Sequence, residues 1–219
     1  RPTKMWVSCE PLLMLKDTPE VRTFVSARVE KEVAEYLSLL TEARRVDLIR
    51  RLQGMHLKNG ILDASKRAVI DALRSKAPLC AEIEQRVTRF AIKDICESII
   101  PSGGIGGWAS LMVISDTHGV APCKMKDAKV IAFRIPVTGS NAIIPLPKDP
   151  FKKGKGHVVT SEVAKRADGD SDGDWLVVVR DPEVVELFKR NLNSKIVTAQ
   201  KPSKTRAQAE LTPDFMTDL

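Results

Sequence analysis

The feature that most constrains the fold is an abrupt change of residue pattern across residues 102–107, Ser-Gly-Gly-Ile-Gly-Gly. Before this segment, apolar residues recur at the three- and four-residue spacing of amphipathic helices. After it, short apolar runs alternate with Gly, Pro and Asp, which is typical of strands joined by turns. We therefore expect an α+β protein with a helical module at residues 1–101, a flexible glycine-rich hinge at 102–107 and a β domain at residues 108–192.

The helical module begins with a clear start signal at Thr18-Pro19-Glu20, where Thr suits the N-cap and Pro the first turn. Its apolar pattern predicts one helical stretch that continues to Gly54. Two further helical segments are expected, from Asp63 to about Lys76 and from Ala81 to Ile100, which gives a module of three or four helices. Residues 1–20 contain three prolines and are expected to be extended, with little regular structure, and to pack on a neighbouring domain.

The arginines near the end of the long helical stretch form a basic cluster. We interpret them as a solvated face and keep contact with a nucleic-acid backbone as the second hypothesis. The cluster consists of Arg44, Arg45, Arg50 and Arg51.

The second half of the chain predicts a small β-barrel or sandwich followed by one helix. A helix over Val184–Asn191 is capped by Asp181, and a polar tail or linker follows at residues 193–219. The expected strands are Leu111–Ser115, Lys129–Ile135, Asn141–Ile144, His157–Thr160 and Trp175–Val179.

The charge of the chain favours a polyanionic partner. Lys and Arg outnumber Asp and Glu by 35 to 28, which gives a net charge of +7. Some of these cations flank an acidic segment that ends at Asp174, and they are candidate contacts to a nucleic-acid backbone. They are Lys152, Lys153, Lys155, Lys165 and Arg166.

The remaining composition predicts an intracellular protein, cytoplasmic or nuclear, and a viral protein would show the same features. No apolar run approaches the length of a membrane-spanning helix, and no secretory signal is visible. The four cysteines show no Cys-x-x-Cys spacing, which argues against zinc and against a disulfide framework. The first residue is Arg1 and not Met, so we expect a fragment or a processed piece. The three histidines are isolated in sequence, and a surface or locally bonded role is expected for each.

The segment Asp168-Gly169-Asp170-Ser171-Asp172-Gly173-Asp174 places four carboxylates on alternate residues, directly before the apolar run Trp175–Val179. Crowded carboxylates repel one another, and a hard cation such as Mg²⁺ or Ca²⁺ removes that conflict. An EF-hand does not fit, because the twelfth position counted from Asp168 is Val179, where the loop needs Glu. A metal site is the first hypothesis, and a solvated acidic turn is the alternative.

The core of this segment, Asp170-x-Asp172-Gly173-Asp174, resembles the DxDGD signature of the two-barrel RNA polymerases. That superfamily includes the largest subunit of cellular RNA polymerases, single-chain phage and plasmid relatives, and the RNA-dependent polymerases of gene silencing. An Arg-x-Pro element at Arg134-Ile135-Pro136 adds to the resemblance, because Arg134 stands 36 residues before Asp170, the family's spacing. After this element, Val-Thr-Gly-Ser at residues 137–140 replaces the Thr-Leu-His-Arg of cellular enzymes, which points to a phage, plasmid or silencing-type relative.

The resemblance covers residues 108–192 and implies a catalytic double-psi β-barrel. It implies that Asp170, Asp172 and Asp174 hold the catalytic Mg²⁺, for which Mn²⁺ can substitute, while Asp168 lies outside the ligand set. It also implies that the element with Arg134 and Pro136 binds nucleotide, with Arg134 touching the sugar of the incoming nucleoside triphosphate or the primer end. The expected function is Mg²⁺-dependent nucleotidyl transfer to an RNA 3′ end on a nucleic-acid template, with DNA as the first template hypothesis.

The family also requires a second double-psi barrel with two catalytic lysines, which residues 20–100 do not supply. We therefore expect that barrel on another chain or in a missing part of the same polypeptide, and no synthesis without it. Three alternatives stay open: an RNA-dependent RNA polymerase, a two-barrel DNA polymerase, and a non-catalytic, calcium-stabilised β-barrel that binds a partner. The sequence does not distinguish a DNA template from an RNA template, or promoter use from primer use.

Overall fold

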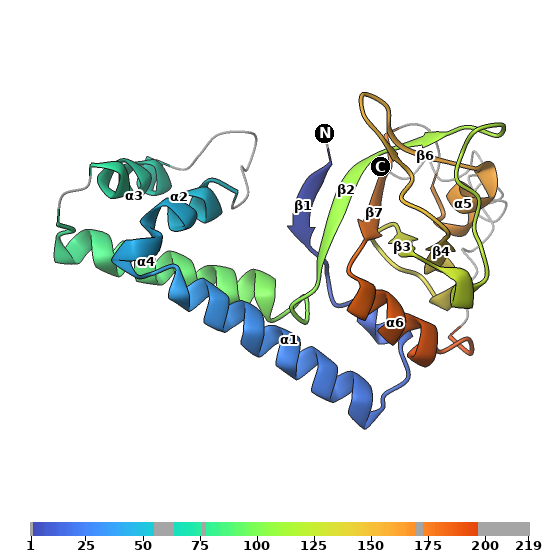
Figure 1. The fold of residues 1–219 in the computed structure, drawn as a ribbon, viewed down its shortest axis with the longest axis horizontal. Coiled ribbons are helices and arrows are strands. Elements are labelled where there is room, and N and C mark those ends of the chain that lie inside the picture. The colour runs from blue at the N-terminus through green and yellow to red at the C-terminus, as the bar shows by residue number, and fades with distance from the viewer. Residues whose placement is uncertain (1, 55–63, 76–77, 170–172, 197–219) are drawn as a thin grey trace, which may run out of the picture.

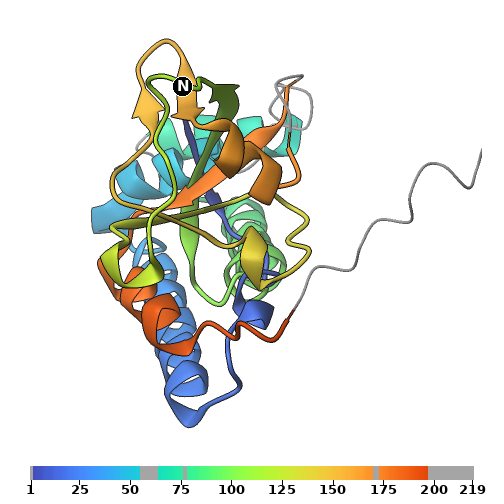
Figure 2. The ribbon, with the colours of Figure 1, turned by 90° about the vertical axis from the view of Figure 1, so that its right-hand side faces the viewer.

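The computed structural model describes residues 2–54, 64–75, 78–169 and 173–196. Within these ranges the fold is mixed α/β, with an arm of helices beside a curled sheet that forms half of a barrel (Figures 1 and 2). No helix in the described part is long and apolar enough to cross a membrane.

Several helices precede the glycine-rich segment, as expected, and together they form the helical arm. Thr18 caps the first helix as expected, because its hydroxyl accepts a hydrogen bond from the Val21 amide at 3.3 Å. A separate hydrophobic core, with Leu52, Val69 and Ile99 fully buried, holds the arm together. The helices are α1 (Pro19–Ser38), α2 (Arg45–Gly54), α3 (Ala64–Arg74) and α4 (Ala81–Asp94), and α4 continues into the π-helical turn η4 (Ile95–Ile99).

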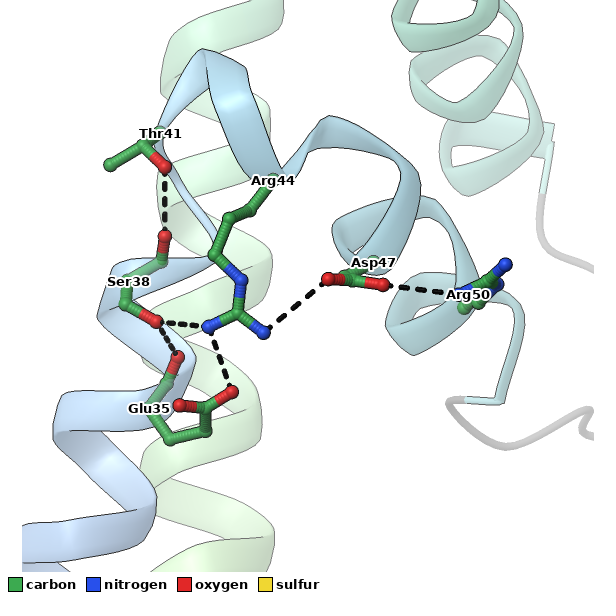
Figure 3. A network of polar contacts seen from close by, with 6 residues as sticks. All are labelled: Glu35, Ser38, Thr41, Arg44, Asp47 and Arg50. Carbon is green, nitrogen blue, oxygen red and sulfur yellow. Dashed lines mark hydrogen bonds and ion pairs between the residues drawn. The ribbon is translucent and has the colours of Figure 1, made fainter.

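The prediction of one helical stretch up to Gly54 was wrong, because the chain turns a corner after Ser38. A short 3₁₀ turn, η2 (Glu42–Arg44), separates α1 from α2. The Arg44 guanidinium reaches back to Glu35 at 2.8 Å and to the Ser38 hydroxyl at 2.6 Å, and forward to Asp47 at 3.4 Å (Figure 3). Contacts across a corner are not visible in apolar periodicity, which continues on both sides of it.

The described part of residues 1–20 contains little regular structure, as expected, but it includes a strand that was not expected. Residues Thr3–Trp6 form strand β1, which pairs antiparallel with β2 (Gly106–Ile114). After the short 3₁₀ helix η1 (Leu12–Met14), the Lys16 amide donates a hydrogen bond to the Asn191 carbonyl at 2.7 Å. The N-terminal segment therefore packs on this chain's own sheet and on its last helix.

The sheet has the strand order β4-β3-β7-β2-β6-β5, and β1 adds to β2 outside this path. Its pairs are antiparallel except β2 with β6, which is parallel. One hydrophobic core contains Ala109, Phe133 and Val177, and a second contains Met112 and Leu176. The remaining strands are β3 (Val130–Phe133), β4 (Ile144–Leu146), β5 (Phe151–Lys152), β6 (Gly156–Val159) and β7 (Trp175–Val179).

Most of the expected elements of the β half are present, with one error. Residues 140–142 form a 3₁₀ turn, and the strand expected at Asn141–Ile144 lies instead at Ile144–Leu146. Strand β5 and the short helix α5 (Ser161–Arg166) were not anticipated. The predicted cap of helix α6 (Pro182–Asn191) is confirmed, since an Asp181 carboxylate oxygen accepts hydrogen bonds from the amides of Glu183 and Val184.

The first part of the glycine-rich segment, residues 102–105, forms a packed turn after the arm, and Gly106 and Gly107 already belong to β2. Gly103 and Gly104 have φ angles of +59° and +70°, which favour glycine. A Cβ on Gly104 would lie 2.8 Å from the backbone carbonyl carbon of Arg28 in α1. These glycines thus allow close packing in the structure, and a hinge motion at 102–107 stays a prediction.

Candidate functional site

The two motifs singled out in the sequence meet at one end of the sheet. The Arg134 Nη2 lies 2.6 Å from the Asp174 Oδ1, and the Arg134 Nη1 donates a hydrogen bond to the Asp168 carbonyl at 2.7 Å. Both side chains are partly shielded, with 29% of Arg134 and 16% of Asp174 exposed. Residues 40 positions apart in the chain (174 − 134) thus form a charge-assisted contact.

Strand pairing explains this convergence. Strands β3 and β7 run antiparallel with Phe133 opposite Val177, so continuing the register brings Arg134 opposite Leu176. The Arg134 side chain reaches Asp174, which lies two residues earlier on the same side of the strand. The Asp174 carbonyl accepts a hydrogen bond from the Met112 amide at 2.8 Å, which fixes the end of the acidic loop against β2. The fold therefore places Arg134 beside Asp174 through backbone geometry.

The loop before the acidic residues approaches the same point from helix α5. The Gly169 amide bonds to the Ala164 carbonyl at 2.9 Å, and Asp168 adopts a φ of +53°. A Cβ on Gly169 would lie 2.4 Å from the Met112 Cε and 3.2 Å from the Asp174 Oδ2. Only a residue without a side chain fits there without displacing its neighbours, so Gly169 allows the backbone after α5 to approach Met112 and Asp174 closely.

Two of the three expected metal ligands, Asp170 and Asp172, lie outside the described residues. Among the residues that are described, no group of three His, Cys, Asp or Glu side chains lies close enough to hold a metal ion. Gly173, between Asp172 and Asp174, has a φ of +122°, a conformation that L side chains rarely adopt. The third ligand is thus placed beside Arg134, and the complete ligand set stays a prediction.

Pro136 lies near this contact and is exposed. It follows a cis peptide bond from Ile135, and the next amide, that of Val137, donates a hydrogen bond to the Glu10 Oε2 at 2.8 Å. Sequence reasoning missed Glu10, because nothing in a segment near the N-terminus suggests a contact 127 residues away. Glu10 fixes the segment that directly follows Arg134.

The candidate backbone-binding cations lie in two places. The β5–β6 hairpin carries three exposed lysines, Lys152, Lys153 and Lys155. Its strand β5 lies four positions from β3 in the sheet. Lys165 and Arg166 end α5, immediately before the acidic loop. Lys165 is exposed, whereas the Arg166 Nε donates a hydrogen bond to the Asn141 carbonyl at 3.2 Å.

The arginine cluster of the helical arm is not simply a solvated face. The Arg51 guanidinium donates two hydrogen bonds to the buried Asp94, at 2.7 and 3.0 Å. It also lies 5.0 Å from the ring centroids of both Trp6 and Tyr36. Burial, followed by the charge of Asp94, raises the pKa of Tyr36 to about 12. Arg51 is thus a structural connection between the arm and β1.

His157 is fully buried and bonded locally. Its Nδ1 lies 2.7 Å from the Ser110 hydroxyl, and the Phe151 ring packs edge-on against it at a centroid distance of 5.8 Å. Burial lowers the pKa of His157 below the usual range, although Asp149 opposes the shift. Because the imidazole is buried and contacts Ser110 and Phe151, we assign it a structural role.

Comparison with known proteins identified no family model and no curated protein that match the chain.

Proposed function

We propose that this chain is the catalytic, largest-subunit-like part of a two-barrel RNA polymerase, and that its curled sheet belongs to a double-psi β-barrel. On this proposal it performs DNA-directed, Mg²⁺-dependent nucleotidyl transfer, together with a second barrel that residues 20–100 do not form. The observation that carries the proposal is the 2.6 Å contact between Arg134 and Asp174. A structural calcium loop does not need an arginine that reaches its last carboxylate from another strand.

The donor set fits a magnesium ion. Carboxylate oxygens are the ligands that Mg²⁺ prefers, and Asp174 lies on a turn whose glycine allows neighbouring carboxylates to point towards one position. We propose that Asp170 and Asp172 complete the set. When bound, the metal would supply electrostatic stabilisation to the reacting phosphate and lower the pKa of the attacking hydroxyl.

The residues of this chain have separate roles in the proposed reaction. Asp174, with Asp170 and Asp172, would hold the cation through carboxylate oxygens. Arg134 presents a planar fork of donors that suits the ribose hydroxyls or a phosphate of the incoming nucleotide. Because Arg134 contacts Asp174 in the structure, nucleotide binding and metal binding should be coupled through this side chain.

Metal binding by the 219-residue chain is the direct test, because it does not require the second barrel. Mn²⁺ titration followed by electron paramagnetic resonance should show weak binding that nucleoside triphosphate strengthens. Changing Asp170, Asp172 and Asp174 together to Asn should abolish it, while circular dichroism stays that of the wild type. Tight Ca²⁺ binding that ignores nucleotide, or unfolding of Asp172→Asn alone, would reject the proposal and favour a structural calcium site.

Arg134 offers a matched pair of variants. Arg134→Ala removes the cation beside Asp174, so Mn²⁺ alone should bind about 3- to 10-fold more tightly, whereas the strengthening by nucleotide should disappear. Arg134→Lys keeps the charge but loses the fork, so Mn²⁺ affinity should stay near the wild-type value with the nucleotide effect still lost. Nucleotide strengthening that survives in both variants would remove Arg134 from the proposed site.

A further inference from the structure

Two large apolar side chains are exposed side by side where β2 and β7 meet. Leu111 and Trp175 are direct cross-strand partners, and 44% and 55% of their surfaces are exposed. The next four residues of β7, 176–179, are all buried. Because side chains alternate along β7, Trp175 and Val177 lie on the same side of the sheet. Val177 is part of the hydrophobic core on that side, whereas Trp175 lies past the edge of that core.

The β5–β6 hairpin extends this surface with lysines. Phe151 contacts the buried His157, so the next residue, Lys152, points to the opposite side of the sheet. Lys152 pairs with Gly156, and because His157 pairs with Met112, Gly156 lies beside Leu111. Gly156 has no side chain that could cover Leu111, and there is no room for one, because a Cβ on Gly156 would lie 2.3 Å from the Leu111 carbonyl oxygen.

Trp175, Leu111, Gly156 and Lys152 thus form one line across four strands, which we name the Trp175 row. Three strand spacings separate its ends, or about 14 Å. Lys153 and Lys155 are exposed in the turn of the hairpin beside Lys152. The hairpin projects from the sheet in both ribbon views, at the top (Figures 1 and 2).

We propose that the Trp175 row is a binding site for single-stranded nucleic acid, in which a base stacks on the indole of Trp175 and the lysines hold backbone phosphates. An exposed aromatic platform beside a basic track is the arrangement that binds single strands without sequence preference. A duplex is a poorer ligand, because its bases are already stacked. A protein partner is also less favoured, because lysines are depleted in protein–protein interfaces.

The row and the proposed metal site are separate surfaces that share the start of β7. Trp175 directly follows Asp174, and successive side chains of a strand point to opposite sides. The carboxylate of Asp174 is held by Arg134 on its own side. Strand binding by the row therefore needs no metal, and it can be tested in EDTA independently of the proposed polymerase function.

The test is fluorescence anisotropy with a labelled 12-nucleotide RNA of mixed sequence, the same sequence as DNA, and its duplex, all in EDTA. The full chain should bind both single strands more tightly than the duplex, and relative affinity for RNA and DNA then identifies the preferred strand. Trp175→Ala should weaken binding about 5- to 150-fold, and Trp175→Phe should restore most of it. Bound strand should also quench tryptophan fluorescence in the wild type but not in Trp175→Phe.

The lysines are tested by salt dependence with a matched control. Changing Lys152, Lys153 and Lys155 to Gln should make the slope of log affinity against log salt shallower by about 2, for three lost phosphate contacts. The control changes Lys124, Lys126 and Lys129, which are exposed near the opposite end of the sheet, and should leave the slope within about 0.5. Equal slopes in the two triple variants, or wild-type affinity in Trp175→Ala, would overturn the proposal. So would loss of self-association in Trp175→Ala without loss of strand binding.

Discussion

At the scale of single residues, charged side chains are used in two different ways on the two sides of this molecule. Arg51 is surrounded by two aromatic rings and a buried carboxylate, so its charge is committed to the fold. Arg134 contacts Asp174, which is less deeply buried than Asp94 and lies at the end of a loop. The residue types are the same, and the two arginines differ in the burial of their carboxylate partners.

The buried imidazole of His157 should make stability depend on pH. The pKa of His157 is lowered in the folded state and is about 6.5 in the unfolded chain. At a pH between the two pKa values, the imidazole is protonated in the unfolded chain but neutral in the folded protein. Stability should therefore fall as the pH drops below about 6.5, by at most about 1.4 kcal/mol per pH unit for one proton. Urea unfolding at pH 7.5, 6.5 and 5.5 should show this loss in the wild type and a smaller loss in His157→Gln.

Carboxylates also titrate in this range, so the comparison needs a second histidine. His118 is exposed, and His118→Gln should leave the pH dependence of the wild type unchanged. Identical pH profiles for all three proteins would mean that His157 is already accessible to protons in the folded state.

At the scale of elements, the packed glycines between the arm and the sheet set a steric limit. Gly104 has a φ of +70° and no room for a Cβ, whereas Gly154 in the β5–β6 hairpin has a φ of +80° and nothing within 4 Å of that position. Gly154→Ala should cost only the backbone strain, about 1–2 kcal/mol. Gly104→Ala should cost about 1–3 kcal/mol more, because the methyl group meets the backbone of α1.

Thermal and urea unfolding of the two alanine variants measure this difference directly. Equal losses of stability would show that α1 can move away from Gly104 at little cost, and would support the hinge expected from the sequence.

Elements whose signals are local could be predicted from the sequence. The caps at Thr18 and Asp181 were correct, because a cap is decided by a hydroxyl or carboxylate and amides two or three residues away. Strand β1 was missed, because its partner in β2 is about a hundred residues away. The same limit applies to the candidate site: the sequence suggested Arg134 and Asp174, but not that Glu10 holds the segment beside them.

At the scale of the whole molecule, Arg51 provides one of several contacts between the helical arm and the rest of the fold, beside the ion pairs of Arg28 in α1 with Asp181 and Glu183. Arg51 in α2 lies against Trp6 in β1 and pairs with Asp94 in α4, whose side chain is 6% exposed. Arg51→Gln would leave a buried carboxylate without its cation and should lower the unfolding free energy by about 3 kcal/mol. The double variant Arg51→Gln/Asp94→Asn should recover part of this loss, because its buried side chain at position 94 carries no charge. A double-mutant cycle then measures the coupling between the two residues.

An exposed ion pair in the same arm is the control. Arg86 and Glu82 lie 2.7 Å apart with 40% and 71% of their side chains exposed, so Arg86→Gln should cost less than about 1 kcal/mol. If Arg51→Gln costs no more than Arg86→Gln, the arm is held by its other contacts, which are apolar packing and the Arg28 ion pairs, and not by Arg51.

The pairing of β1 with β2 gives the helical arm an unexpected topological status. The two strands are antiparallel neighbours, yet the whole arm lies between them in the sequence. Near the exit from the arm, Gly104 packs against the backbone of Arg28 in α1. The arm is thus an insertion in a β-hairpin, with its entry and exit points in contact. Such an insertion can change in length at the end remote from the sheet without altering the strand order, provided that the parts of α1 and α2 that contact the sheet, at Val21 and Arg51, are kept.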